Sequence, residues 1–105
     1  MTRVTVVSQA VIDLDASLGP DELARACGAD LHWVRELVSC GVLAERPGDP
    51  SGWRFASADL SRARRARRLQ RDFDLELEAA ALMLDLMDEV QRLRRRLRAF
   101  GLDAG

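Results

Sequence analysis

The chain has 105 residues, of which 48% are hydrophobic and 31% charged, and its formal net charge is −1. This length supplies one hydrophobic core and an extension, which excludes two independent cores and argues against an enzyme with a deep pocket. Two cysteines, Cys27 and Cys40, are too few for a disulfide scaffold, so we expect reduced core thiols and a cytoplasmic protein. No charged-then-apolar leader opens the chain and no apolar run approaches 18 residues, so we expect neither secretion nor a membrane span.

The charges are segregated into blocks. Residues 1–61 carry five Arg and nine acids, residues 62–71 carry six Arg and no acid, residues 72–89 carry seven acids and no Arg, and residues 92–98 carry five Arg. Such blocks are usually solvated helix faces, but the acidic block is also a usable docking surface for a basic partner.

The first part of the chain predicts short strands and then two short helices. Residues 3–7 and 10–15 are rich in Val, Ile and Thr, which favours one extended strand or two short ones. Gly19-Pro20-Asp21-Glu22 is typical of a helix start, and this helix should run to about Cys27. Asp30 can cap a second helix over residues 31–39, with Gly41 at the position after its end. Two short helices joined by a turn that contains Gly have the outline of a helix-turn-helix.

The middle of the chain predicts a wing and a third helix. Residues 46–52 are rich in turn formers, and Trp53-Arg54-Phe55 favours a strand after them. Ser57 or Ser61 can cap the next helix, whose apolar residues recur at helical spacing. We place a joint between two helices at residues 72–74, where the apolar phase changes and Asp74 can cap the helix that follows.

Residues 75–100 predict one long helix, because the stretch lacks Gly and Pro and repeats apolar residues in heptads. Such a helix is about 39 Å long, more than a small preceding domain can cover. The apolar stripe therefore predicts a homodimer, although the helix can alternatively lie on its own domain. Charges alone leave the polarity open, since Glu89 faces Arg94 in a parallel pair and Arg96 in an antiparallel one. Ala79 stands at the first d position, and the predicted dimerisation residues are Met83, Leu86, Val90, Leu93, Leu97 and Phe100.

The predicted fold is therefore mainly α. Residues 1–60 form a winged helix-turn-helix with small β strands, and residues 61–105 form a linker helix and a long coiled-coil-like dimerisation helix.

The order of parts resembles the winged-helix domain of MerR-type regulators. The resemblance covers residues 23 to about 82 and rests on Leu23-Ala24, Gly28, Val34-Arg35, Gly41-Val42-Leu43, Gly52-Trp53-Arg54-Phe55 and Asp59-Leu60. The resemblance extends further through Arg68-Leu69, the stretch over residues 84–90 and the Arg-rich end. With these parts included, nearly the whole chain is similar to the CbpM family of bacterial chaperone modulatory proteins. The resemblance implies a non-catalytic adaptor without a cofactor, which pairs in antiparallel fashion. It also implies that this adaptor binds the J-domain of a CbpA-like co-chaperone and inhibits its stimulation of Hsp70.

The acidic joint is the favoured partner site. Phe73, Leu75 and Leu77 alternate with acids, so at least one apolar side chain should stay near the surface inside an acidic ring. A J-domain presents a basic helix, which complementary charge would steer while a leucine supplies the buried anchor. In the alternative, both leucines only pack the helices together and the arginines only bridge to Asp72. The predicted J-domain-binding residues are Arg65, Arg68, Asp72, Leu75, Glu76 and Leu77.

The alternative function is that of a MerR-type DNA-binding transcriptional regulator, in which Arg35 on the second helix and Trp53 with Arg54 on the wing contact DNA. The acidic balance of residues 1–61 disfavours it, although the six Arg of residues 62–71 restore some positive charge. Arg54 can equally be structural. His32 stands alone, without ligands at metal-binding spacing, and we predict neither a metal site nor a catalytic residue.

Overall fold

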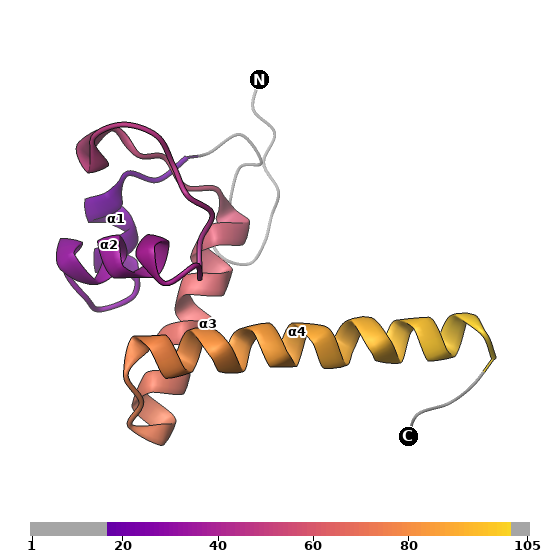
Figure 1. Ribbon diagram of the computed structural model, residues 1–105. Helices are drawn as coiled ribbons and strands as arrows, with labels where there is room; N and C mark the ends of the chain where they lie inside the picture. Colours follow the sequence, from indigo (N-terminus) through magenta and orange to yellow (C-terminus); the bar gives the residue numbers. More distant parts are fainter. Residues whose placement is uncertain (1–16, 102–105) are drawn as a thin grey trace.

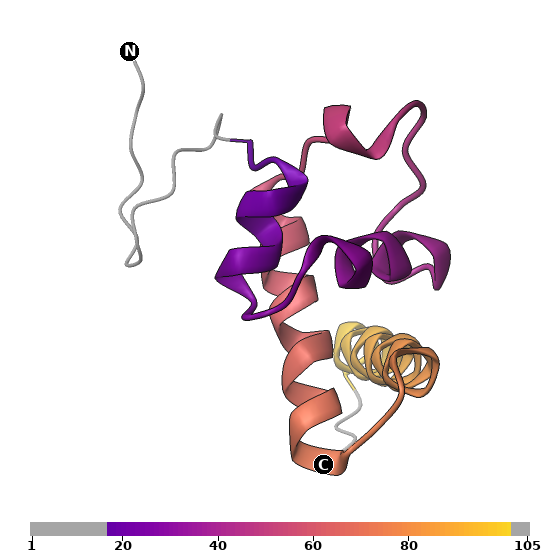
Figure 2. The same ribbon diagram turned by 90° about the vertical axis from the view of Figure 1, so that its left-hand side faces the viewer.

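The computed structural model describes residues 17–101, which fold into four α-helices. They are α1 (Pro20–Ala26), α2 (Leu31–Ser39), α3 (Ser57–Phe73) and α4 (Leu77–Ala99), with a short 3-10 turn, η1 (Pro50–Gly52), before α3. Helices α1, α2 and α3 form a body, and α4 crosses α3 and extends well beyond that body (Figures 1 and 2). The strands predicted at residues 3–7 and 10–15 lie outside the described residues. Between residues 17 and 101, no helix combines the length and the apolar character needed to span a membrane.

The helix-turn-helix forms where the sequence predicts it. The Gly19 amide donates to Glu22 Oε1 at 2.7 Å, and Pro20 opens α1. Asp30 caps α2, because its Oδ1 accepts from the Trp33 amide at 3.0 Å. Gly41 follows the end of α2 with φ 80°, a left-handed conformation that glycine adopts without strain. The two capping bonds span three residues each, which explains why local sequence is sufficient to predict them.

Within residues 17–101, the predicted wing is a loop with one β bridge. The Leu18 and Phe55 backbones pair in both directions, at 2.8 and 2.9 Å, and this is the β pairing found between residues 17 and 101. The side chain of Arg46 holds the loop together. Its Nε donates to the Arg54 carbonyl at 3.0 Å, and its guanidinium lies 4.3 Å from the centre of the Phe55 ring. Arg46 also pairs with Asp59 at 2.6 Å, which joins the loop to α3.

Neither serine caps α3. Its N-cap is Ala56, whose amide donates to Asp59 Oδ2 at 2.8 Å, so Ser57 is already helical. The prediction for the other end of α3 is also wrong. Asp74 adopts φ 54° and closes α3, and α4 begins at Leu77 rather than at Leu75. The physical reason is that the Leu75 amide donates back to the Gln70 carbonyl at 3.1 Å, which commits this backbone to ending α3.

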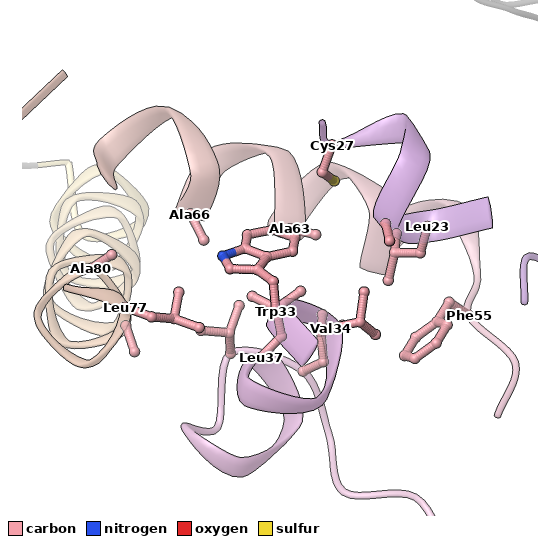
Figure 3. Close-up of a cluster of buried hydrophobic side chains, with 14 of the residues drawn as sticks. Leu23, Cys27, Trp33, Val34, Leu37, Phe55, Ala63, Ala66, Leu77 and Ala80 are labelled. Atoms are coloured by element: carbon pink, nitrogen blue, oxygen red, sulfur yellow. The ribbon is translucent and has the colours of Figure 1, made fainter. Parts of the chain in front are cut away.

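One hydrophobic core joins all four helices. The side chains of Leu23, Val34, Leu37 and Phe55 are buried at its centre (Figure 3). On α3, the residues buried in this core are Ala63 and Ala66. Their small side chains allow the neighbouring helices to pack close to α3. Helix α4 contributes Leu77, Ala80, Ala81 and Leu84. The boundary predicted between residues 60 and 61 falls inside α3, and the division into two domains stays a prediction.

Candidate partner-binding surface

The joint between α3 and α4 is held by a short hydrogen-bond relay. Trp33 Nε1 donates to Gln70 Oε1 at 2.8 Å, and Gln70 Nε2 donates to the Leu75 carbonyl at 3.2 Å. Helix α2 therefore fixes the path of the chain between α3 and α4. Because the relay bonds are part-buried and join three separate segments, the joint is a preorganised surface rather than a loose linker.

The three apolar side chains of the joint have different surroundings. Phe73 is 60% exposed, Leu75 is half-buried and Leu77 is only 6% exposed, within the core. Leu77 therefore packs the helices together, as in the alternative weighed for it, whereas Phe73 is the apolar side chain left at the surface. The acids around it, Asp72, Asp74, Glu76 and Glu78, are all exposed.

A shallow hollow lies between α3 and α4, next to the joint. It encloses about 120 Å³ and is lined by Arg65, Arg68, Leu69, Asp72, Leu84 and Met87. Three of the predicted partner-binding residues thus meet at one hollow, and Leu75 and Glu76 follow in the joint. Arg65 pairs with Asp88 at 3.5 Å. Among the residues that the structure describes, no ion pair links Arg65 or Arg68 to Asp72.

The crossing of α3 and α4 is fixed by ion pairs that the sequence analysis missed. Arg62 reaches Asp85 at 3.1 Å and Asp88 at 2.6 Å, and its Nε donates to the Val42 carbonyl at 2.7 Å. The Arg62 guanidinium holds the pKa of the Asp88 carboxyl below its usual range, chiefly through the hydrogen bond that Arg62 Nη1 donates to Asp88 Oδ2. The partners lie 23 and 26 residues apart in sequence, so no local pattern points to them.

Helix α4 carries two distinct apolar faces. One face packs on α3, and the other is exposed. Much of α4 extends beyond the body formed by the other helices (Figure 1). On the exposed face, Leu86 is 58% and Phe100 is 73% exposed, with Val90 and Leu93 also exposed and Met83 and Leu97 half-buried. Leu82 and Met87 are exposed too, although the heptad register did not include them. The homodimer stays a prediction that this uncovered stripe supports.

The residues of the DNA-binding alternative lie on two separate elements. Arg35 is exposed on α2, next to Glu36, which pairs with His32 at 3.6 Å. Trp53 is half-buried and packs edge-to-face against Phe55, with ring centres 6.3 Å apart. Arg54 is exposed in the loop.

Both thiols are free, as predicted. Burial raises the pKa of the Cys27 thiol, and it raises the pKa of the Cys40 thiol together with the nearby carboxylates of Glu78 and Glu36. Neither environment favours a thiolate. Between residues 17 and 101, no group of three or more His, Cys, Asp or Glu side chains is arranged to hold a metal ion.

Comparison with known proteins points to one family. The MerR HTH family of regulatory proteins matches residues 18–100. The chaperone modulatory protein CbpM of Coxiella burnetii (strain Dugway 5J108-111) is 28% identical over 93 residues, which cover 89% of this chain and 88% of that protein. CbpM of Pseudomonas entomophila (strain L48) is 33% identical over 72 residues, covering 69% and 71%. CbpM of Pseudomonas putida (strain W619) is 39% identical over 62 residues, covering 59% and 61%. No solved structure matches the chain.

Proposed function

Because this chain belongs to the CbpM family of chaperone modulatory proteins, within the MerR HTH regulatory proteins, we propose that it is a non-catalytic adaptor for a co-chaperone. In this proposal it binds the J-domain of a CbpA-like protein and inhibits the stimulation of Hsp70 by that protein, in the cytoplasm. The family assignment supports the class of partner, and the joint between α3 and α4 supplies the surface.

The observation that carries the proposal is the exposed Phe73 in a stretch of chain whose acidic residues, Asp72, Asp74, Glu76 and Glu78, are exposed as well. An aromatic side chain that is 60% exposed has most of its apolar area still to bury, and buried aromatic anchors dominate the free energy of protein interfaces. The exposed Asp72 and Asp74 adjoin Phe73 in sequence and Glu76 follows, and these carboxylates attract a basic helix of the J-domain. The sequence predicted Leu75 or Leu77 as the anchor; in this proposal Phe73 takes that role, together with the half-buried Leu75, because Leu77 is buried in the core.

The hollow between α3 and α4 extends this surface. Arg68 lines the hollow and is exposed. Arg65 also lines it and forms an ion pair with Asp88. Both arginines suit carboxylates that flank the basic helix of the partner, because a guanidinium binds a carboxylate through two parallel hydrogen bonds. Exposed pairs of this kind contribute about 0 to 1 kcal/mol each, so they fix orientation more than affinity.

We also propose that the adaptor is a homodimer whose α4 helices pair in antiparallel fashion. The exposed stripe of α4 is continuous over several turns, and it is separate from the face that packs on α3. Pairing two copies covers it without disturbing the joint. The residues proposed for this seam are Met83, Leu86, Val90, Leu93, Leu97 and Phe100.

Calorimetric titration of the full chain into the purified J-domain of the same organism tests the adaptor proposal. Phe73→Ala should weaken binding by about 2 kcal/mol or more, which is about thirtyfold in Kd. Leu82→Ala is the matched control, because Leu82 is 61% exposed but is neither among the proposed J-domain-binding residues nor in the lining of the hollow, and it should leave the Kd unchanged. Glu76→Arg should slow association, most strongly at low salt. Absence of heat and of a complex with the unmodified chain would refute the adaptor.

The second candidate, sequence-specific DNA binding, is favoured by the match to MerR HTH proteins and by the exposure of Arg35 and Arg54. A regulator should shift duplex DNA with an affinity that falls steeply as salt rises, and Arg35→Ala should abolish the shift. Trp53 would then shape the loop through Phe55 rather than contact bases. A chain that retains no duplex at low salt is not a DNA-binding regulator.

A further inference from the structure

Five arginines converge on one groove between α1 and α3. Four of them stand on α3 at positions i, i+3, i+4 and i+7, which places them on one face over about 10.5 Å of helix. The fifth, Arg25, stands in the last turn of α1. The groove encloses about 410 Å³ and is lined by Arg25, Ala26, Cys27, Gly28, Arg64, Arg67, Arg68 and Arg71.

The positive charge of this groove is not neutralised by the described part of the chain. Residues 17–101 form ion pairs through Arg46, Arg62, Arg65 and Arg92, but through none of the five groove arginines. No acidic residue is among those that line the groove. Five like charges brought together in this way create a strongly positive local potential, which attracts anions.

Arg67 is fixed in place at the floor of the groove. Its Nη2 donates to the Gly28 carbonyl at 3.2 Å, and its guanidinium lies 5.6 Å from the centre of the Trp33 ring. In Figure 2 the turn that contains Gly28 lies beside α3. Burial raises the pKa of the Cys27 thiol, and the positive charges of Arg64, Arg67 and Arg71 oppose that rise. Arg67 is therefore held in place before any ligand arrives, which lowers the entropic cost of binding one.

The size and lining of the groove indicate the kind of anion. A volume of about 410 Å³ falls in the range of small-molecule sites. A protein partner needs an apolar anchor, yet the non-arginine lining consists of Ala26, Gly28 and the buried Cys27. Nucleic acid needs charge spread over an interface of roughly 1,000–2,500 Å², whereas these guanidinium groups converge.

We propose that the groove between α1 and α3 binds a small, multiply phosphorylated anion with two or more adjacent phosphate groups. The planar guanidinium matches phosphate oxygens through paired hydrogen bonds, and several converging arginines match several adjacent phosphates. The site is separate from the joint that carries Phe73. Arg68 is the one residue that lines both hollows, so it is left unchanged in the test.

Calorimetric titration with sodium tripolyphosphate, in magnesium-free buffer, tests this site on the full chain. Binding should saturate at one anion per chain, and orthophosphate should bind at least about tenfold more weakly, because it engages fewer arginines. Arg64→Ala combined with Arg71→Ala should weaken tripolyphosphate binding by at least about tenfold. Both residues are exposed, so the fold should be unaffected. Replacing the same two residues with Lys should restore only part of the affinity, since a lysine keeps the charge but not the paired hydrogen bonds.

The matched control is Arg95→Ala combined with Arg98→Ala, which removes the same charge from exposed positions on α4. This pair should leave tripolyphosphate binding unchanged. Equal losses in the two double variants would overturn the site in favour of general charge attraction, as would the absence of saturable binding. A single-stranded oligonucleotide that binds through Arg64 and Arg71, and that tripolyphosphate fails to displace, would overturn the ligand class. The J-domain titration is independent of each of these outcomes.

Discussion

Leu93→Asp should separate the proposed dimer into single chains. Leu93 is 45% exposed in one chain, so about half of the 1.5–3 kcal/mol gained by burying a leucine is available to a seam. Two copies together then contribute about 2 kcal/mol, all of which is lost in the variant. Two carboxylates placed at the seam add a desolvation penalty of at least about 1 kcal/mol, even with Arg96 in reach. The dissociation constant should rise by a factor of about one hundred or more.

Sedimentation equilibrium at micromolar concentration measures this change directly. Gln91→Asp introduces the same charge at an exposed position outside the seam, and it should keep the mass of two chains. Helical content by circular dichroism should stay nearly constant in both variants, because Leu93 lies beyond the part of α4 that packs on α3. A mass of one chain for the unmodified protein, or a mass of two chains for Leu93→Asp, would refute the reasoning about the stripe.

Three further predictions concern the stability of the described fold. Asp30→Ala removes the N-cap of α2, which should cost about 1 kcal/mol and lower the midpoint of thermal unfolding by about 4–8 °C; an unchanged midpoint would contradict this role. Gln70→Ala leaves Trp33 Nε1 without its acceptor, and urea titration should show a loss of about 1–3 kcal/mol, more than Gln91→Ala on exposed α4. The pKa of Asp88 is lowered in the folded chain, so its stabilising effect is present above the ordinary carboxyl pKa and is lost as pH falls through the lowered value. Acid should therefore reduce the thermal stability of the unmodified chain more than that of Asp88→Asn, and parallel pH profiles would exclude the linkage.

At the joint between α3 and α4, the sequence predicts part of the structure correctly and part of it wrongly. The heptad pattern correctly predicts that a long helix follows residue 74, but it carries the helix back to Leu75, where the chain instead turns to bond Gln70. The alternation of acids and apolar residues correctly predicts that an apolar side chain stays at the surface, while the acidic ring around it stays a prediction. It cannot say which one, because Phe73 and Leu77 are equally apolar and differ only in what packs against them.

The sequence by itself determined the features whose cause lies within a few residues. The start of α1, the cap of α2, its glycine end and the helical character of residues 57–73 and 77–99 follow from bonds and periodicities that span one or two turns. The tertiary structure decided which groups meet across long separations. Arg62 reaches Asp88 26 residues away, Arg67 reaches Gly28 39 residues away, and Trp33 reaches Gln70 37 residues away. Because side-chain burial and charge pairing depend on how helices cross rather than on neighbours in the chain, the placement of Phe73 at the surface and the convergence of five arginines became apparent only in the folded molecule.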